Sequence, residues 1–245
     1  MPTIDINCDL GEGCANDAEL MSYISSANIA CGAHAGDAAT MLRTAELALK
    51  HSVAIGAHPG YRDKENFGRT NLSLTLDEVQ ALVTEQIEAM AEICERLGAR
   101  MHHVKPHGAL YNQAAKDTKL AAAIAAAVKA FDPELVLYGL SGSVSITEAE
   151  RIGLRTASEV FADRTYQNDG SLTPRSQPNA LITSVEASAE QVLNMAKYSR
   201  VRTVDAIMFH IKADTVCIHG DGDHALEFAE AIHSALTDNG FQIKA

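Results

Sequence analysis

Ionisable side chains recur where short apolar segments of this sequence end. Asp9 lies at the end of the first segment, His34 follows the second, His58 closes the third and Lys105 lies near the end of the fourth. A carboxylate can act as a general base or orient an imidazole, and an imidazole can carry a proton between reacting groups. A lysine beside carboxylates stays charged and suits an anionic group. These four residues are predicted to form a catalytic centre.

A second set of polar residues lies in the same motifs and is predicted to bind substrate or phosphate. Arginine belongs in such a set because its guanidinium group pairs with carboxylate or phosphate oxygens through two hydrogen bonds. The predicted binding residues are Asn7, Glu12, Arg69, His107, Asp163, Arg164, Arg175 and His219. Asp221, two residues after His219, belongs to the same strand end.

The histidines also allow a metal-binding interpretation. Asp9, His34 and His58 could supply one carboxylate and two imidazoles to a divalent ion. No helical HxxxH or HExxH pattern supports this ligand set, so it is kept only as the alternative to a site without a resident metal.

The sequence contains no familiar nucleotide-binding motif. It contains no GxxxxGK[ST] phosphate loop, and no GxGxxG motif follows an expected strand. If ATP is used, its binding site is therefore of another kind or lies on a partner chain.

Short apolar segments alternate with amphipathic helical patterns, which predicts parallel β-α-β units. The expected strands are 3–10, 27–32, 53–58, 102–106, 135–140, 155–162 and 215–219. Seven units spread evenly along the chain suit one barrel domain spanning residues 1–245. The long irregular stretch 163–179 is predicted to be a lid-like loop, because structureless segments of this length in compact domains are usually functional.

Alternation within the strands predicts where the polar residues point. In the first strand Asp5, Asn7 and Asp9 share one face, and the apolar residues between them share the other. Helices would cover the apolar face, so the polar face would turn to the barrel interior. Such interiors are normally packed with Val, Ile and Leu, so polar side chains there indicate an active site at the carboxyl ends of the strands.

The composition narrows the class of partner. The chain has 245 residues, 47% hydrophobic and 21% charged, with a formal net charge of −12. An acidic surface repels phosphate backbones and anionic lipid, so neither nucleic acid nor a membrane is an expected partner. The five cysteines form no CxxC pair and the start lacks the pattern of an export signal, which predicts a cytoplasmic setting.

Eight motifs occur in order along the chain: NCDLGEG at 7–13, SANIACGAHAGD at 26–37, GAHPGY at 56–61, NFGR at 66–69, HVKPHGALYN at 103–112, EVFADRTY at 159–166, DGSLTPR at 169–175 and CIHGD at 217–221. Together they resemble the LamB/YcsF family from residue 3 to the C-terminal helix. The resemblance implies an α/β fold, a single-domain, seven-stranded, irregular (β/α) barrel similar to those of glycoside hydrolases and polysaccharide deacetylases.

The resemblance also implies a reaction. The family supplies one component of the ATP-dependent 5-oxoprolinase that opens 5-oxoproline to L-glutamate, acting with two further subunits, B and C. The expected function is therefore hydrolysis of this cyclic amide, coupled to ATP. Two alternatives stay open: a metal-dependent deacetylase or amidase with the same barrel, and a non-catalytic subunit that binds the substrate for its partners.

Overall fold

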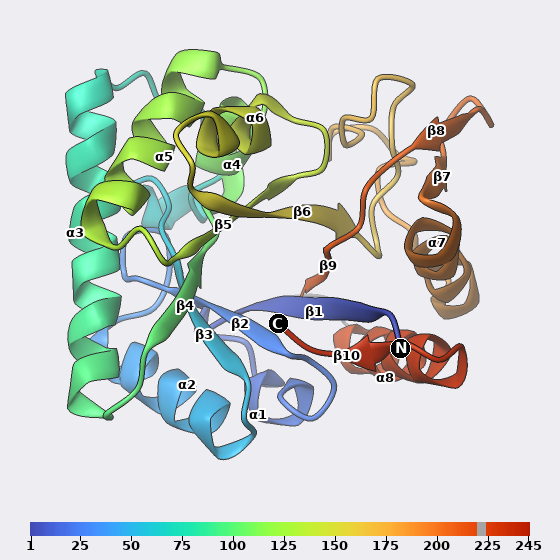
Figure 1. Cartoon of the computed structure of the whole chain (residues 1–245), viewed down its shortest axis with the longest axis horizontal. Coiled ribbons are helices and arrows are strands. Elements are labelled where there is room, and N and C mark those ends of the chain that lie inside the picture. The colour runs from blue at the N-terminus through green and yellow to red at the C-terminus, as the bar shows by residue number, and fades with distance from the viewer. Residues whose placement is uncertain (220–223) are drawn as a thin grey trace.

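Seven parallel strands close into a barrel in the computed structural model, which describes residues 1–219 and 224–245 (Figure 1). The barrel strands are β1 (Thr3–Leu10), β2 (Ser26–Ala30), β3 (Ala54–His58), β4 (Met101–Val104), β5 (Val136–Leu140), β6 (Arg155–Phe161) and β9 (Thr215–His219). Each strand pairs with the next, and β9 closes the ring by pairing with both β6 and β1. The predicted seven-stranded barrel is confirmed, with each boundary within two residues of its expected position.

Helices surround the barrel in Figure 1. They are α1 (Asp17–Leu20), α2 (Ala38–Lys50), α3 (Leu76–Arg96), α4 (Gly108–Ala114), α5 (Thr118–Phe131), α6 (Val144–Arg151), α7 (Val185–Tyr198) and α8 (Ala225–Asp238), with one 3-10 turn, η1 (Lys64–Asn66). In the described part of the chain, none of these helices is long and apolar enough to cross a lipid bilayer.

Three short strands were not expected from the sequence. β7 (Arg200–Arg202) and β8 (Met208–His210) form an antiparallel pair beside α7, and β10 (Gln242–Ile243) extends the sheet next to the start of β1. Figure 1 shows the two chain ends close together at this point. All three strands lie outside the closed ring, so they leave the arrangement of the site unchanged.

Local sequence signals explain where the helices begin. The side chain of Thr75 accepts a hydrogen bond from the Glu78 amide, and the Glu78 carboxylate accepts one from the Thr75 amide, which is a capping box. The helix α3 therefore starts at Leu76. Asp37 caps α2 by accepting a hydrogen bond from the Thr40 amide.

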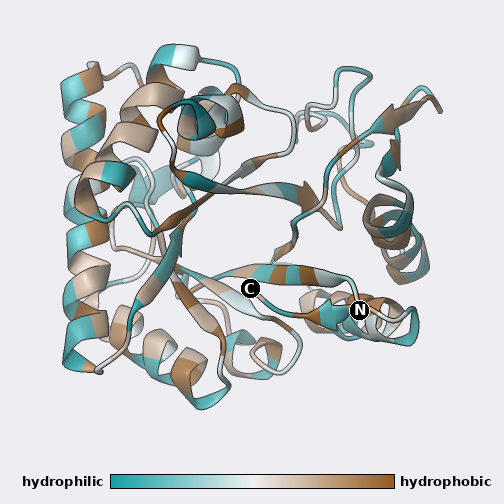
Figure 2. Ribbon diagram, viewed as in Figure 1, coloured by the Kyte–Doolittle hydropathy of each residue, from teal (hydrophilic) through white to brown (hydrophobic). Residues whose placement is uncertain are grey.

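The alternation expected for the first strand is present. Figure 2 shows hydrophilic and hydrophobic bands succeeding one another along β1. Ile6, Cys8 and Leu10 are fully buried members of the hydrophobic core. Asn7 and Asp9 instead bond to side chains from other strands of the barrel. The apolar side chains of β1 therefore belong to the hydrophobic core, while its polar side chains point into the interior of the barrel.

A layer of polar side chains fills the lower part of the barrel. The ring of His103 stacks on Tyr138 at a centroid distance of 4.2 Å, and its Nε2 lies 2.7 Å from Asn28 Oδ1. The ring occupies the space beside Gly56, where any Cβ would overlap it. Any residue larger than glycine at position 56 would therefore collide with the His103 ring.

The predicted lid-like loop 163–179 is folded against the end of β6. Arg164 donates from Nε to the Ala180 carbonyl and from Nη2 to the Thr173 carbonyl. Tyr166 is fully buried, and its hydroxyl accepts a hydrogen bond from the Phe161 amide. The loop therefore has side-chain anchors of its own, although it contains only isolated bridges of regular structure.

The packing around His103 gives a stability prediction. Gly56→Ala is expected to lower the free energy of unfolding by about 1–3 kcal/mol, because the new methyl group overpacks a rigid ring. Urea denaturation followed by circular dichroism measures the change. Gly139→Ala, in β5, is the matched control: its methyl group would meet the flexible end of Ile146 at 3.3 Å and should cost less. Equal losses for both variants would contradict this account of Gly56.

Candidate functional site

A cavity of about 680 Å³ opens at the carboxyl ends of the barrel strands. Of the residues predicted from the sequence, its lining contains Asp9, Glu12, His58, Arg69, Lys105, His107, Arg164, Arg175 and His219. The other three, Asn7, His34 and Asp163, are behind this lining. Asp221 is outside the described residues. Strand ends from all around the ring therefore converge on one space, as the strand-end argument predicts.

Lys105 is the central cation of the site. Its Nζ lies 2.8 Å from Asp9 Oδ1 and 2.7 Å from Glu159 Oε1, and all three side chains are buried. The Nζ also donates to Asn7 Oδ1 at 3.1 Å and lies 3.1 Å from Cys217 Sγ. Its contact with Glu159 is an ion pair without hydrogen-bond alignment. One ammonium group thus links β4 to β1, β6 and β9.

The charges of this group are fixed by their neighbours. Burial alone would lower the pKa of Lys105, but Asp9 and the other acidic group beside it, Glu159, raise that pKa well above its usual range. Burial would likewise raise the pKa of Asp9, but His58 and Lys105 lower it well below its usual range. At neutral pH Lys105 is therefore a cation and Asp9 a carboxylate, so Lys105 stabilises charge and does not act as a base.

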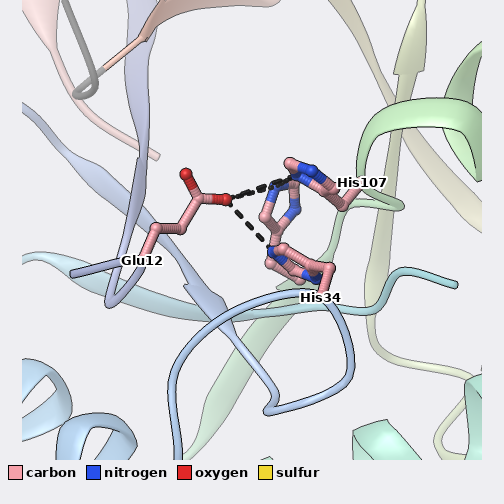
Figure 3. A group of neighbouring side chains, drawn as sticks. Glu12, His34 and His107 are labelled. Carbon is pink, nitrogen blue, oxygen red and sulfur yellow. Dashed lines mark hydrogen bonds and ion pairs between the residues drawn. The ribbon is translucent and has the colours of Figure 1, made fainter. Parts of the chain in front are cut away.

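Three histidines and one glutamate meet beside Asp9. Glu12 Oε1 lies 3.1 Å from His34 Nε2, 3.3 Å from His107 Nδ1 and 3.8 Å from His58 Nε2. Figure 3 shows the Glu12 carboxylate directed at His34 and His107. The rings of these two histidines stack at a centroid distance of 3.8 Å, and His58 lies edge-on to both.

Backbone carbonyls orient two of these rings. His58 Nδ1 donates to the Lys105 carbonyl at 2.6 Å, and His107 Nε2 donates to the Phe67 carbonyl at 2.9 Å. The remaining nitrogens, His58 Nε2 and His107 Nδ1, then face each other at 2.9 Å. A carbonyl can only accept, so the tautomers of both rings follow from these contacts.

Burial and neighbouring charge separate the protonation of the three imidazoles. Burial, together with His58, lowers the pKa of His34 to about 3 and that of His107 to about 2. Burial also opposes a charge on His58, but Asp9, whose Oδ2 lies 3.3 Å from its Nε2, raises the pKa of His58. His34 and His107 are therefore neutral at physiological pH, with lone pairs available.

Glycines leave the space that the histidines occupy. A Cβ at Gly60 would lie 2.7 Å from His34 Nδ1, and one at Gly68 would lie 2.8 Å from His34 Cβ. Gly68 also has a φ of +65°, which side-chain-bearing residues rarely adopt. Glycine at positions 60 and 68 therefore lets the backbone pack closely against His34.

Two groups of residues have the ligand types and proximity that a metal ion requires. Among the described residues they are Glu12, His34, His58 and His107, and Asp9, Cys217 and His219, and within each group the ligand atoms lie within 4.8 Å of one another. The set proposed from the sequence combined Asp9 with His34 and His58. The structure instead places the two histidines with Glu12 and His107, and Asp9 with the other group.

The opposite wall carries an imidazole–carboxylate pair. His219 Nδ1 lies 2.8 Å from Asp163 Oδ2, and its ring stacks on Phe161. Burial would raise the pKa of Asp163, but His219 and the arginines nearby lower it. Arg175 is exposed at the rim, whereas Arg164 is buried with its donors turned to carbonyls of the loop. Arg164 thus anchors the loop in addition to lining the cavity.

Sequence reasoning missed three members of the site. Glu159 is the second carboxylate at Lys105, Cys217 touches the same ammonium group, and Asn28 links Asp9 to His103 through its amide. A signal existed for Glu159, because it lies near the carboxyl end of the sixth expected strand, the end where the other site residues gather. For Cys217 the only signal was strand alternation with His219, which places both on the inner face.

Comparison with known proteins places the chain in a family. The family model described as "LamB/YcsF family" matches residues 4–245. The chain belongs to the LamB/YcsF family. A relative from Brevibacillus brevis, named as the A subunit of 5-oxoprolinase, is 54% identical to this chain over 250 residues, covering 100% of the chain and 98% of the relative.

Solved structures confirm the fold expected of the LamB/YcsF family. The crystal structure of the lactam utilization protein from Thermus thermophilus has a TM-score of 0.93 and 42% identity, with 99% of each chain covered. The peptidoglycan deacetylase PdaC from Bacillus subtilis has a TM-score of 0.52 at 14% identity, covering 99% of this chain and 87% of that chain. The second likeness concerns the fold alone, and it agrees with the expected deacetylase-like barrel.

The buried cation gives a second prediction. Lys105→Met is expected to lower the free energy of unfolding by about 3–5 kcal/mol, because Asp9 and Glu159 would remain buried without a cation. Chemical denaturation measures the loss. Lys212→Met is the matched control, since Lys212 pairs with Asp214 at the surface and should contribute at most about 1 kcal/mol. An unfolding midpoint for Lys105→Met equal to that of the control would contradict the central role of this ion pair.

Proposed function

We propose that this chain is the hydrolytic A subunit of an ATP-dependent 5-oxoprolinase, which opens 5-oxoproline to L-glutamate together with subunits B and C. The observation that carries the proposal is the 54% identity, over the whole chain, to a protein named as the A subunit of 5-oxoprolinase. The Thermus thermophilus protein, whose structure covers 99% of this chain, bears the name lactam utilization protein, and 5-oxoproline is a lactam.

The cavity suits a small anion with a polar ring. Arg69 and Arg175 contribute guanidinium groups to its lining, and such groups bind carboxylates through charge-assisted hydrogen bonds. A volume of about 680 Å³ exceeds what a five-membered ring needs, so the same cavity can hold a phosphorylated form of the substrate. These features support a substrate that enters with one or more negative charges.

The chemistry requires activation because a lactam is an unactivated amide. Phosphorylation of the lactam oxygen by ATP makes the ring carbon electrophilic, and water then adds to that carbon. The carbon–nitrogen bond breaks as the nitrogen takes a proton, which leaves an acyl phosphate, and a second water releases glutamate and phosphate. Two waters and one ATP balance the reaction to glutamate, ADP and phosphate.

The reaction needs a base that takes a proton from the attacking water and an acid that gives a proton to the ring nitrogen. Residues on the two sides of the cavity can fill these two roles. Asp9 is ionised and accessible from the cavity, so it is the proposed base for the attacking water. His219, which is oriented by Asp163, is the proposed proton donor to the ring nitrogen of the substrate. A ring nitrogen of His219 lies within 4.8 Å of a carboxylate oxygen of Asp9. Lys105 holds Asp9 in position and in its charged form. His58, also predicted to move protons, lies next to Asp9.

ATP cleavage is assigned to the partner subunits in this proposal. The chain has no phosphate loop of the GxxxxGK[ST] type, and its cavity is built from histidines and carboxylates as well as from cations. Subunits B and C would then form the phosphorylated lactam and this chain would open it. A divalent metal ion would accompany the ATP at that step.

Reconstitution tests the proposed function. Glutamate formation from 5-oxoproline and ATP is measured with this chain, with B and C, and with all three together. We expect turnover only for the complete mixture, and a decrease of at least about 100-fold for Asp9→Asn, since general-base catalysis contributes that much or more. Circular dichroism checks that the variant is folded. Full turnover by B and C alone, or by Asp9→Asn, would refute the assignment.

If Asp9→Asn abolishes turnover but 5-oxoproline still binds by calorimetry, the residue acts in the chemical step. If this chain binds 5-oxoproline tightly and strand-end substitutions weaken binding alone, it is instead the non-catalytic binding subunit. The two measurements together therefore separate the two functions.

Arg175 gives a further test of the cavity. Arg175→Gln is expected to raise KM for 5-oxoproline about tenfold or more with little change in kcat, because a charge-assisted hydrogen bond is worth about 1.5–3 kcal/mol. Initial rates of the reconstituted enzyme provide both constants. Arg151→Gln, which alters a surface arginine paired with Glu148, is the control and should change neither. An unchanged KM for Arg175→Gln would remove this residue from the substrate site.

A further inference from the structure

We infer that Glu12, His34, His58 and His107 form a binding site for one divalent transition-metal ion of the zinc type. Glu12, His34 and His107 lie in the connections after β1, β2 and β4, and His58 is the last residue of β3. The inference is independent of the proposed function, because metal binding can be measured without ATP or 5-oxoproline.

Four of the six distances between ligand atoms are close to those of a tetrahedral shell. Four ligands at about 2.0–2.1 Å from a zinc ion are separated from one another by about 3.3 Å. The separations here are 2.9 Å from His58 Nε2 to His107 Nδ1, 3.1 Å from His34 Nε2 to Glu12 Oε1, and 3.3 Å from His107 Nδ1 to Glu12 Oε1. The separation from His58 Nε2 to Glu12 Oε1 is 3.8 Å, and all four ligand atoms lie within 4.8 Å of one another. The rings of His34 and His107 are stacked, so one of them would turn on binding to bring both nitrogens onto the ion.

The hydrogen bonds behind the rings support the same conclusion. Metal-binding histidines usually donate their other ring N–H to a carbonyl or carboxylate, which fixes the tautomer and the ring orientation. His58 donates to the Lys105 carbonyl and His107 to the Phe67 carbonyl. His34 Nδ1 has no hydrogen-bond partner among the described residues. The tautomer of His34 therefore depends on the group that its other nitrogen, Nε2, contacts.

A proton alone accounts less well for this arrangement. A proton on His58 Nε2 serves Asp9 at 3.3 Å or His107 at 2.9 Å. When this proton is directed at Asp9, the lone pair of His107 Nδ1 faces the carboxylate oxygen of Glu12 at 3.3 Å. A metal ion at the centre accepts both lone pairs together with those of the other two ligands.

The ligand set selects the class of metal. Three imidazoles and one carboxylate suit zinc, cobalt, nickel or iron(II), whereas magnesium and calcium prefer shells built of oxygen atoms. His34 is buried behind the cavity wall, while Glu12, His58 and His107 line the cavity. The ion would therefore lie in the wall of the cavity. A molecule bound in the cavity could reach it with an oxygen atom.

Metal content and Co²⁺ spectroscopy test the inference. The full-length protein is stripped with a chelator and dialysed, and Zn²⁺ alone is then titrated by calorimetry, with elemental analysis of the dialysed product. We expect one equivalent per chain. Co²⁺ in the same site should give the strong visible absorption of a four-coordinate ion with nitrogen and oxygen ligands.

Three variants locate the ion. Glu12→Gln and His107→Asn should each weaken Zn²⁺ binding by more than about 100-fold, since even the loss of a residue behind a metal ligand costs 10–100-fold. His219→Gln is the matched control, because it alters the neighbouring group with Asp9 and Cys217 and should leave the affinity unchanged. Circular dichroism and urea denaturation show that each variant is folded, and Glu12→Gln keeps the shape of the side chain.

Two results would overturn the inference. The first is no stoichiometric binding of Zn²⁺ or Co²⁺ by the native chain. The second is binding that persists in Glu12→Gln and His107→Asn but disappears in His219→Gln, which would place the ion with Asp9 and Cys217. Neither result bears on turnover in the reconstitution, so a failure here is distinguishable from a failure of the proposed function.

Discussion

The charge balance around Lys105 is the constraint on which the barrel interior depends. A buried ammonium group is costly unless carboxylates surround it, and here Asp9 and Glu159 both lie within 2.8 Å of it. Each charge comes from a different strand, so the ion pairs form only when the ring has closed. The same contacts keep Asp9 ionised and facing the cavity. Structure and proposed chemistry thus rest on one cluster of charges.

The cavity has two walls of different character. On one side the imidazoles of His34, His58 and His107 surround Glu12, with the tautomers of two of them set by backbone carbonyls. On the other side His219 is paired with Asp163, and the loop that follows adds Arg175. Asp9 lies between the walls and contacts both His58 and Lys105. A molecule in the cavity would therefore meet basic nitrogen lone pairs on one flank and cationic or proton-donating groups on the other.

Much of this arrangement was predictable because period-two alternation and strand ends are local properties of the sequence. They placed Asp9, His58 and Lys105 in one space and gave the barrel strands. The partners of those residues were harder to predict. Glu159 and Cys217 reach Lys105 from distant parts of the chain, so only the closed ring brings them together. Glu12 was grouped with anion-binding residues because its position after Gly11 did not indicate that it meets three histidines.

The contact between Lys105 and Cys217 has a consequence for redox chemistry. A lysine beside a thiol usually favours the reactive thiolate. Here burial raises the pKa of Cys217 well above its usual range, and the nearby carboxylates add to that effect, so the pKa stays high although Lys105 lowers it. The sulfur is also fully enclosed. Oxidants and alkylating reagents attack exposed thiolates, so this thiol at the centre of the site is chemically inert in the folded protein.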